Sequence, residues 1–509
     1  MAFDRASRRP PTRHPTVVGS MTYATLARHL CWLKGARPGG HGRVGPFADC
    51  VDHEHLHARL ARTQTGCCKP NERLDARALT RPCCRIIAGE MAQVPRTRSF
   101  IWRSPDFLRL WSAGTISDLG SAVTELALPL TAILILSATP LQIGVLGAAR
   151  ALPFLIVGLA AGVVVDRSRP VPLLVGTDVG RAVLLGSIPV AYAVGQLHMP
   201  QLYVVAFVAG GMTVLFGVAE AATIHAIAPR QDLIGANSKM AVSGSIAAVA
   251  GPGLGGLLIG ALSAPVAILV DAVSFLFSAA VLRGIRANAS TPRTEAPRSG
   301  VVTDVKEGLN FIIRHEVLRT LAIALSLMNL FFAVFFTAYL LYAVRILHLT
   351  PFVLGVIFAI AGVAGLAGAA VAPRIGNRFG VGRVITAGAG LSALALLLIP
   401  MAPVASPIPW LVVGESVQAF GVLAFNSTQL GLRQSLTPAR LQGRMTASMR
   451  FLIQALTPVG AIVGGILGST IGLHATLWIG AIGSFAAVVP FLVANFPAIR
   501  AIPSQEPVA

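Results

Sequence analysis

Several ionisable side chains stand inside long apolar stretches of this chain, where they could bind or release protons. Asp118 and Glu125 lie in one such stretch, and Arg150 lies in the next. A charged group in hydrocarbon is costly, so each should face a cavity or a partner. Seven residues, about two helical turns, separate Asp118 from Glu125, which predicts that both side chains lie on one face of a helix.

Glu125 and Arg150 are predicted to lie at similar depths. They stand about eleven and about nine residues from the adjacent ends of their stretches, so at 1.5 Å per residue their depths agree within ~3 Å. A carboxyl group in a low-dielectric cavity prefers its neutral form, whereas a nearby guanidinium favours the charged form. We therefore predict proton binding at Glu125, assisted by Asp118 and tuned by Arg150. A purely structural ion pair is the alternative.

Further ionisable residues stand in later apolar stretches. Asp178 and Arg181 are three residues apart, the spacing of a pair on one helix. Single acids occur at Glu220, Asp271 and Glu415.

The composition is that of a membrane protein. Apolar residues make up 54% of the chain and charged residues only 12%, outside the balance of soluble domains. Runs of about 20 residues without uncompensated charge predict membrane-spanning helices. There are twelve of them, near 109–136, 141–165, 171–194, 200–226, 237–262, 264–283, 317–344, 351–372, 383–402, 408–430, 444–468 and 474–495.

The chain repeats itself. Thr139-Pro140 with Gly144-Val145 returns as Thr350-Pro351 with Gly355-Val356, an offset of 211 residues. At the same offset Asp166-Arg167 corresponds to Asn377-Arg378. A second echo, offset by 206 residues, pairs the stretch before Pro252-Gly-Leu-Gly-Gly256 with the one before Pro458-Val-Gly-Ala-Ile-Val-Gly-Gly465. The fold expected is therefore an all-α multi-pass membrane protein of twelve helices in two six-helix bundles, 105–283 and 317–495. Such duplication is typical of secondary transporters.

Loop charges predict the orientation. Arginine recurs after helices 2, 4, 6, 8 and 10, whereas Arg345 is the one cation in the alternate loops. Positive loops face the cytoplasm, which places both termini there. Residues 284–316 form a cytoplasmic linker with a short amphipathic helix expected at 301–315, and 496–509 form a cytoplasmic tail.

Residues 1–90 differ from the rest of the chain. They hold all six cysteines and six of the eleven histidines, and they are strongly basic. Cys67-Cys68, Cys83-Cys84 and His53–His57 could bind zinc, but adjacent cysteines match structural zinc sites poorly. We expect a disordered extension, or a segment that is not translated because the protein begins at Met91.

Four motifs resemble the major facilitator superfamily. Gly162-Val-Val-Val-Asp166-Arg167 looks like its loop signature, and the region of Gly251-Pro252 with Gly255-Gly256 is similar to the motif of its drug antiporters. Asp271-Ala-Val-Ser-Phe275 and the run Arg433–Arg444 resemble the bacterial branch of enterobactin exporters and macrolide-efflux proteins. The resemblance covers about 105–495.

The resemblance implies roles for these residues and also has gaps. It places Asp166 against the start of helix 11, as a gate, although anchoring of the loop is an alternative. For the Gly251-Pro252 motif we expect mostly helix packing. Helices 3, 6, 9 and 12 are peripheral in this family, which makes Asp271 a structural partner and leaves Glu220 and Glu415 nearer the cavity. Helix 4 lacks the antiporters' buried arginine.

Other functional classes find little support. The chain has no Gly-x4-Gly-Lys-Ser/Thr nucleotide loop, and its predicted helices hold no hydrolase motif. We expect a transporter, not an enzyme, that exports small amphipathic molecules such as drugs in exchange for protons. A siderophore or metabolite exporter, an importer and a non-transporting sensor are the alternatives. Expected partners are the substrate, protons and the lipid bilayer, without nucleic acid, metal or cofactor, for a monomer in the cell membrane.

Overall fold

A computed structural model describes residues 104–229, 232–286 and 301–499. The expected extension at 1–90, part of the linker and the tail beyond 499 lie outside these ranges. The described elements are helical: α4 (Pro105–Leu134), α5 (Pro140–Arg167), α6 (Pro170–Ala193), α7 (Met199–Ile227), α8 (Leu233–Ala261), α9 (Ala264–Leu282), α10 (Val301–Arg314), α11 (Glu316–Arg345), α12 (Pro351–Phe379), α13 (Val381–Leu396), α14 (Pro407–Leu436), η5 (Ala439–Leu441), α15 (Gln442–Thr470), α16 (Leu473–Ala486), α17 (Val489–Val493) and η6 (Phe496–Ala498).

Each of the twelve predicted membrane spans contains a helix. In the described part, eleven spans are long and apolar enough to cross a membrane, the last of them running through α16 and α17. The ninth, α13, has 16 residues, and its chain continues as turns to Met401. The all-helical, multi-pass fold class is confirmed, with one span shorter than expected.

The sequence repeat is also a repeat of backbone conformation. Thr139 and Thr350 cap α5 and α12, each accepting a hydrogen bond from the backbone three residues later. Just before them, Ser137 and His348 adopt positive φ angles of 49° and 53°. These two residues are also 211 positions apart. The duplicated turn therefore keeps its shape although its side chains differ.

The two halves pack their helices in the same way. In the first half α4 packs on α8 and α9, α5 on α7, and α6 on α7 and α9. The second half repeats these pairs as α11 on α15 and α16, α12 on α14, and α13 on α14 and α16. Contact between the halves is made mainly by α5 with α15 and α8 with α12.

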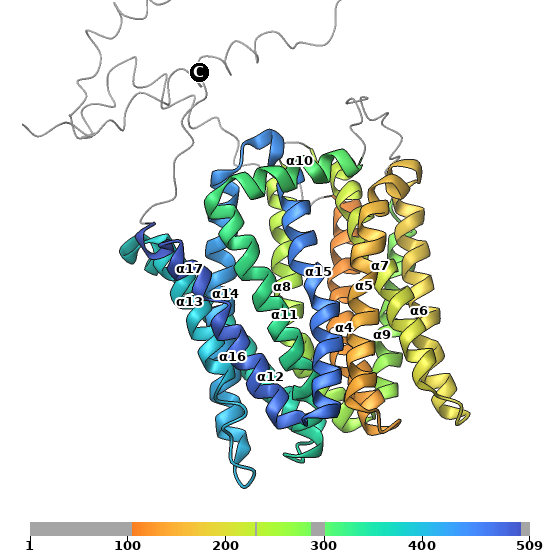
Figure 1. Ribbon diagram of the computed structural model, residues 1–509. Coiled ribbons are helices and arrows are strands. Elements are labelled where there is room, and N and C mark those ends of the chain that lie inside the picture. The colour runs from red at the N-terminus through yellow and green to blue at the C-terminus, as the bar shows by residue number, and fades with distance from the viewer. Residues whose placement is uncertain (1–103, 230–231, 287–300, 500–509) are drawn as a thin grey trace, which may run out of the picture. The chain divides into compact units, whose positions relative to one another are not determined.

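The linker helix α10 defines one end of the molecule, which we call the α10 end. It lies across the ends of the spanning helices (Figure 1) and packs on α15, where a Cβ atom added to Gly308 would lie 2.5 Å from the carbonyl oxygen of Arg444. Glu307 forms an ion pair with Arg444. The amphipathic helix predicted at 301–315 is confirmed, and its contacts tie the linker to α15.

At the opposite end, which we call the far end, glycines bring the halves together. A Cβ atom added to Gly144 of α5 would lie 2.5 Å from the carbonyl oxygen of Ala461 and 3.0 Å from Gly465 Cα on α15. One added to Gly355 of α12 would lie 2.5 Å from Gly256 Cα on α8. Gly144 and Gly355 occupy equivalent positions of the repeat, so the two crossings are copies of one another.

The α10 end differs from the far end. Along α5 and α15 the close contacts begin where Gly144 meets Gly465. They continue as far as Phe154 and Arg450, where the Arg450 guanidinium lies 4.8 Å from the centre of the Phe154 ring. Beyond that level, Cβ atoms added to Gly158, Gly162 and Gly443 would meet nothing within 4 Å. The halves are therefore in backbone contact at the far end.

Replacing Gly256 by alanine should disturb this contact. Gly→Ala within a helix normally stabilises by about 0.5–1 kcal/mol, but here the new Cβ would overlap the backbone of α12, and overpacking costs about 1–3 kcal/mol. We expect Gly256→Ala to lower the midpoint of thermal unfolding in detergent. The matched control Gly158→Ala, which fills open space, should leave it unchanged or raise it. Equal midpoints for both variants would contradict the glycine crossing.

Candidate functional site

Glu125 of α4 and Arg150 of α5 form the ion pair that their depths predict. Arg150 Nη2 lies 2.7 Å from Glu125 Oε1. The side chains are 56% exposed for Glu125 and 48% for Arg150, so the pair is not sealed inside the helix packing. Both charged groups are therefore accessible from outside the helix packing.

Asp118 and Glu220 lie on neighbouring helices toward the α10 end. Asp118 is exposed, as Glu125 is, consistent with one shared face of α4. A Cβ atom added to Gly244 of α8 would lie 3.6 Å from Asp118 Oδ2. A Cβ atom added to Gly114 of α4 would lie 2.9 Å from Oε1 of Glu220 on α7. The carboxyl group of Glu220 also interacts electrostatically with Asp118. The structure thus brings Asp118 and Glu220 together between α4, α7 and α8.

Glu415 stands apart from these acids, on α14 in the other half. Its carboxyl group lies beside the hydroxyl of Tyr339 on α11. Tyr339 is fully buried and stacks on Phe335, with ring centres 5.8 Å apart. Of the predicted acids, Glu415 therefore belongs to a packed aromatic environment and does not join the group around α4.

The predicted gating residues lie at two equivalent helix ends. Gly162, Asp166 and Arg167 form the last turns of α5, and Asn377 and Arg378 those of α12. The side chain of Asp166 is outside the described part. The antiparallel contacts of α5 with α15, from Gly144 with Gly465 to Phe154 with Arg450, lead the end of α5 toward the start of α15.

The antiporter-like motif serves helix packing on two sides of α8. A Cβ atom added to Gly251 would overlap Ala122 of α4, and one added to Gly255 would lie 3.4 Å from Val123. Gly256, one position on, faces Gly355 of α12 across the boundary between the halves. Pro252 lies within α8 between these contacts. The motif therefore allows α8 to pack closely against α4 of its own bundle and against α12 of the other bundle.

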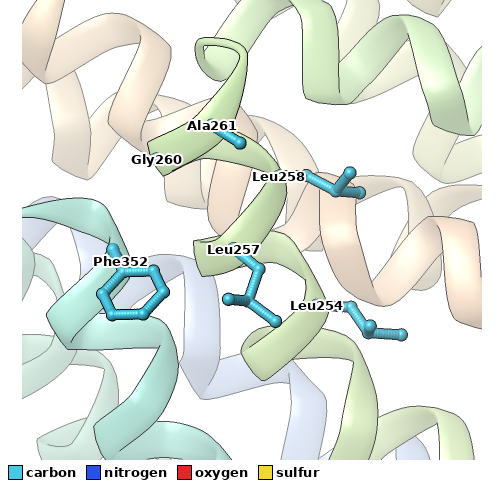
Figure 2. A pocket seen from close by; sticks show the side chains of 6 residues that line it. All are labelled: Leu254, Leu257, Leu258, Gly260, Ala261 and Phe352. Atoms are coloured by element: carbon cyan, nitrogen blue, oxygen red, sulfur yellow. The ribbon is translucent and has the colours of Figure 1, made fainter.

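An apolar groove of about 520 Å³ opens where α8 meets α12 (Figure 2). Its lining residues are Leu254, Leu257, Leu258, Gly260, Ala261 and Phe352. None of the predicted ionisable site residues contributes to it. The described part also contains no group of three His, Cys, Asp or Glu side chains that could hold a metal ion.

Two contacts were not predicted from the sequence. Arg345, the exception in the loop-charge pattern, donates from Nη2 to the carbonyl oxygen of Ala138 at 2.8 Å, so it links the two halves at the far end. Thr124 of α4 donates a hydrogen bond to the carboxylate of Asp271 on α9. A threonine in an apolar stretch gives no signal of its own, whereas an isolated arginine that departs from the loop-charge pattern does.

A family model described as Major Facilitator Superfamily matches residues 110–456, with a second match over 338–508. The chain belongs to this superfamily. The resemblance of the loop and antiporter motifs is thereby confirmed, and residues 1–109 lie outside the match. The superfamily consists of membrane transporters, so this protein is a multi-span transporter of small molecules and not an enzyme.

Named relatives include efflux proteins. The chain is 27% identical over 394 residues to "Multidrug efflux pump Tap" of Mycolicibacterium fortuitum, covering 74% of this chain and 91% of that protein. It is 29% identical over 215 residues to "Uncharacterized MFS-type transporter YfiS" of Bacillus subtilis, covering 42% of this chain and half of YfiS. A crystal structure of the nucleoside transporter NupG shares the fold, with a TM-score of 0.60 at 12% identity, covering 76% of this chain and 99% of that one.

Two ion pairs of the first half, Glu125–Arg150 and Asp178–Arg181, should differ in their contribution to stability. Arg150→Gln breaks a half-exposed pair and should cost less than about 1 kcal/mol. Asp178→Asn removes the partner of Arg181, which is only 3% exposed, and should cost about 3–5 kcal/mol. Unfolding midpoints of the two variants in detergent measure the difference. A loss for Arg150→Gln as large as that for Asp178→Asn would show that the Glu125–Arg150 pair is structural.

Proposed function

We propose that this transporter exports small amphipathic molecules, such as drugs, in exchange for protons across the cell membrane. Support comes from the multidrug efflux pumps among its relatives, which it matches over most of their length. The arginine-rich loops support an orientation with the α10 end and both termini in the cytoplasm. The proton gradient is the proposed energy source, without a bound cofactor, in a protein that works as a monomer without nucleic acid.

The observation that carries the proposal is the accessible ion pair of Glu125 with Arg150. A carboxylate in a membrane span is costly, and this one is neither sealed in the core nor free of a partner. Protonation removes the charge of Glu125 and with it the attraction to Arg150. The pair can therefore exist in two states whose balance depends on protons reaching it.

Alternating access would connect this pair to transport. In the structure the halves are in backbone contact at the far end, where Gly144 meets Gly465 and Gly256 meets Gly355, which supports a gate at this end. With the α10 end in the cytoplasm, the state seen is closed toward the outside, and Glu125 exchanges its proton with the cytoplasm. Cargo binds from the same side, the α10 end closes, and a proton from outside is taken up after the far end has opened.

Asp166 would act at the opposite gate. The course of α5 along α15 leads it toward the first turn of α15, where a carboxylate gains from free N–H groups and the helix dipole. Closing the α10 end brings these two elements together. We propose that the contact forms in the outward-open state and is released in the state seen.

Glu125→Gln should abolish proton-driven efflux yet retain cargo binding and exchange. The amide is the size of the protonated acid but cannot release a proton. The measurement is transport by proteoliposomes of the full chain, first under an imposed proton gradient and then as counterflow without one. The cargo is chosen beforehand by comparing a compound panel in cells with and without the gene.

Glu316→Gln is the matched control, because Glu316 is an exposed acid in the first turn of α11. It should transport as the unmodified protein does. Gradient-driven transport by Glu125→Gln at the unmodified rate would refute the assignment and direct attention to Asp118 or Glu415. Failure of the unmodified protein to show counterflow with any compound of the panel would favour a sensor.

Asp166→Asn should slow transport by roughly fivefold, the rate change that about 1 kcal/mol of carboxylate–helix interaction corresponds to. The amount of folded protein should be unchanged, since the contact depends on state and lies outside the core. Initial counterflow rates and membrane protein levels are measured together. Asp232→Asn, at the start of α8 without a capping hydrogen bond, is the control. Equal losses of protein and transport in Asp166→Asn would indicate an anchoring role.

A further inference from the structure

A group of charged side chains lies buried inside the first half, behind the face that carries Glu125. Asp178 and Arg181 on α6 and Asp271 on α9 are 0%, 3% and 0% exposed. Arg181 pairs with Asp178, as the sequence spacing predicts, and Asp178 Oδ2 also accepts a hydrogen bond of 2.6 Å from Ser278. The centre of the Arg181 guanidinium lies 4.1 and 4.6 Å from the ring centres of Phe275 and Phe216. Arg181 is thus fixed between one carboxylate and two rings.

Asp271 has hydroxyl partners but no ion pair among the described residues. Thr124 of α4 donates to Oδ2, and Ser274 donates to Oδ1 at 3.2 Å. The helix α4 presses its backbone onto this carboxyl group, because a Cβ atom added to Gly120 would overlap Oδ1. The carboxyl group is therefore enclosed on the α4 side and held by two hydroxyls.

The charges around Asp271 do not balance. Two buried carboxylates share one guanidinium, and the charged groups that act on Asp271 in the described part are Arg181 and Asp178, both from α6. Asp118 and Glu220, which also interact with Arg181, add negative charge. An uncompensated carboxylate in a protein interior costs several kcal/mol, and binding of a proton removes that cost.

The other helices packed on α9 do not supply a second cation at this level. α4 contributes the Thr124 hydroxyl. The cation of α8, Lys239, is the neighbour of Met240, which lies against Gly114 of α4. Gly114 stands more than one turn along α4 from Gly120, the residue in contact with Asp271. Lys239 therefore belongs to the level of Glu220, toward the α10 end.

The chemistry of the partners fits a carboxyl group that changes its protonation state. A hydroxyl has one proton to donate and two lone pairs that accept. Thr124 can therefore donate to the carboxylate of Asp271 or accept from its acid form without any change of position. A lysine or arginine there would instead fix the charged form.

The position of Thr124 connects this group to the proposed site. Thr124 and Glu125 are adjacent in α4, so their side chains project about 100° apart around the helix. One meets Asp271 inside the bundle, and the other meets Arg150 at the exposed pair. A rotation or shift of α4 must change both contacts together.

We propose that Asp271 is a second proton-binding residue of the transport cycle, linked to Glu125 through α4. In the state seen it holds a proton as a neutral carboxylic acid, and movement of α4 away from it releases the proton. Release breaks the O–H bond of Asp271 and forms an O–H bond on a water molecule, and uptake of a proton reverses this transfer. This inference rests on the proposed proton coupling and assigns Asp271 a role beyond that of a structural partner.

Infrared difference spectroscopy of the full chain in proteoliposomes tests the proposal directly. The unmodified protein at neutral pH should show the carbonyl stretch of a protonated carboxylic acid, and raising the pH should remove it. Asp271→Asn should lose this band, whereas Glu125→Gln should keep it. Asp106→Asn, a matched change at the Asp106–Arg109 pair near the α10 end, should also keep it. A band of full intensity in Asp271→Asn would overturn the assignment.

Thr124→Ala provides a second test that leaves the carboxyl group in place. Loss of the hydroxyl partner should shift the frequency of the band, and an unshifted band would contradict the proposed contact. In transport assays Asp271→Asn should retain counterflow while taking up fewer protons per cargo, as read by a pH-sensitive dye. An unchanged number of protons per cargo molecule would mean that Asp271 keeps its proton throughout the cycle, and would refute its proposed role. Because the spectral test needs no cargo, it stands even where Glu125→Gln disproves the proposed coupling site.

Discussion

Backbone contact between the two halves at the far end is the constraint on which the rest of the structure depends. Lipid offers no hydrophobic force to hold two apolar bundles together, so close packing must do so. Gly144 with Gly465 and Gly256 with Gly355 permit that packing where any side chain would hold the helices apart.

The two halves share the features that pack their helices together, but they differ in where their charged residues lie. The capped turns at Thr139 and Thr350 keep the same backbone angles, and the two glycine crossings use equivalent positions. The acids are distributed unequally. Away from the helix ends, the spans of the first half hold Asp118, Glu125, Asp178, Glu220 and Asp271, whereas those of the second half hold Glu415. The first half therefore holds most of the acids that lie away from the helix ends, whereas the second half repeats its helix packing.

The sequence predicts the helices well because hydrocarbon selects long apolar runs, and it predicts their ends less well. The eighth span was expected at 351–372, but α12 continues to Phe379. Arg374 and Arg378 interrupt the apolar run without ending the helix, since the last turns can carry charge toward water. The Glu125–Arg150 pair was predictable because both residues are ionisable and their depths can be counted. The contact of Thr124 with Asp271 was not, because neither hydropathy nor spacing distinguishes a threonine that faces an acid from one that faces lipid.

The first spanning helix differs from its neighbours in having no face that serves packing alone. Gly114 makes room for Glu220, Gly120 lies against Asp271, and Ala122 and Val123 receive the glycines of α8. Asp118 and Glu125 occupy the side that remains exposed. A helix in contact with acids on several sides cannot move without changing the surroundings of more than one of them. Under the proposed proton coupling, proton binding at one of these groups would alter the position that α4 prefers, and a change in that position would alter proton binding at the others by the same free energy. Such reciprocity would need no dedicated pathway, since these acids either belong to α4 or contact it.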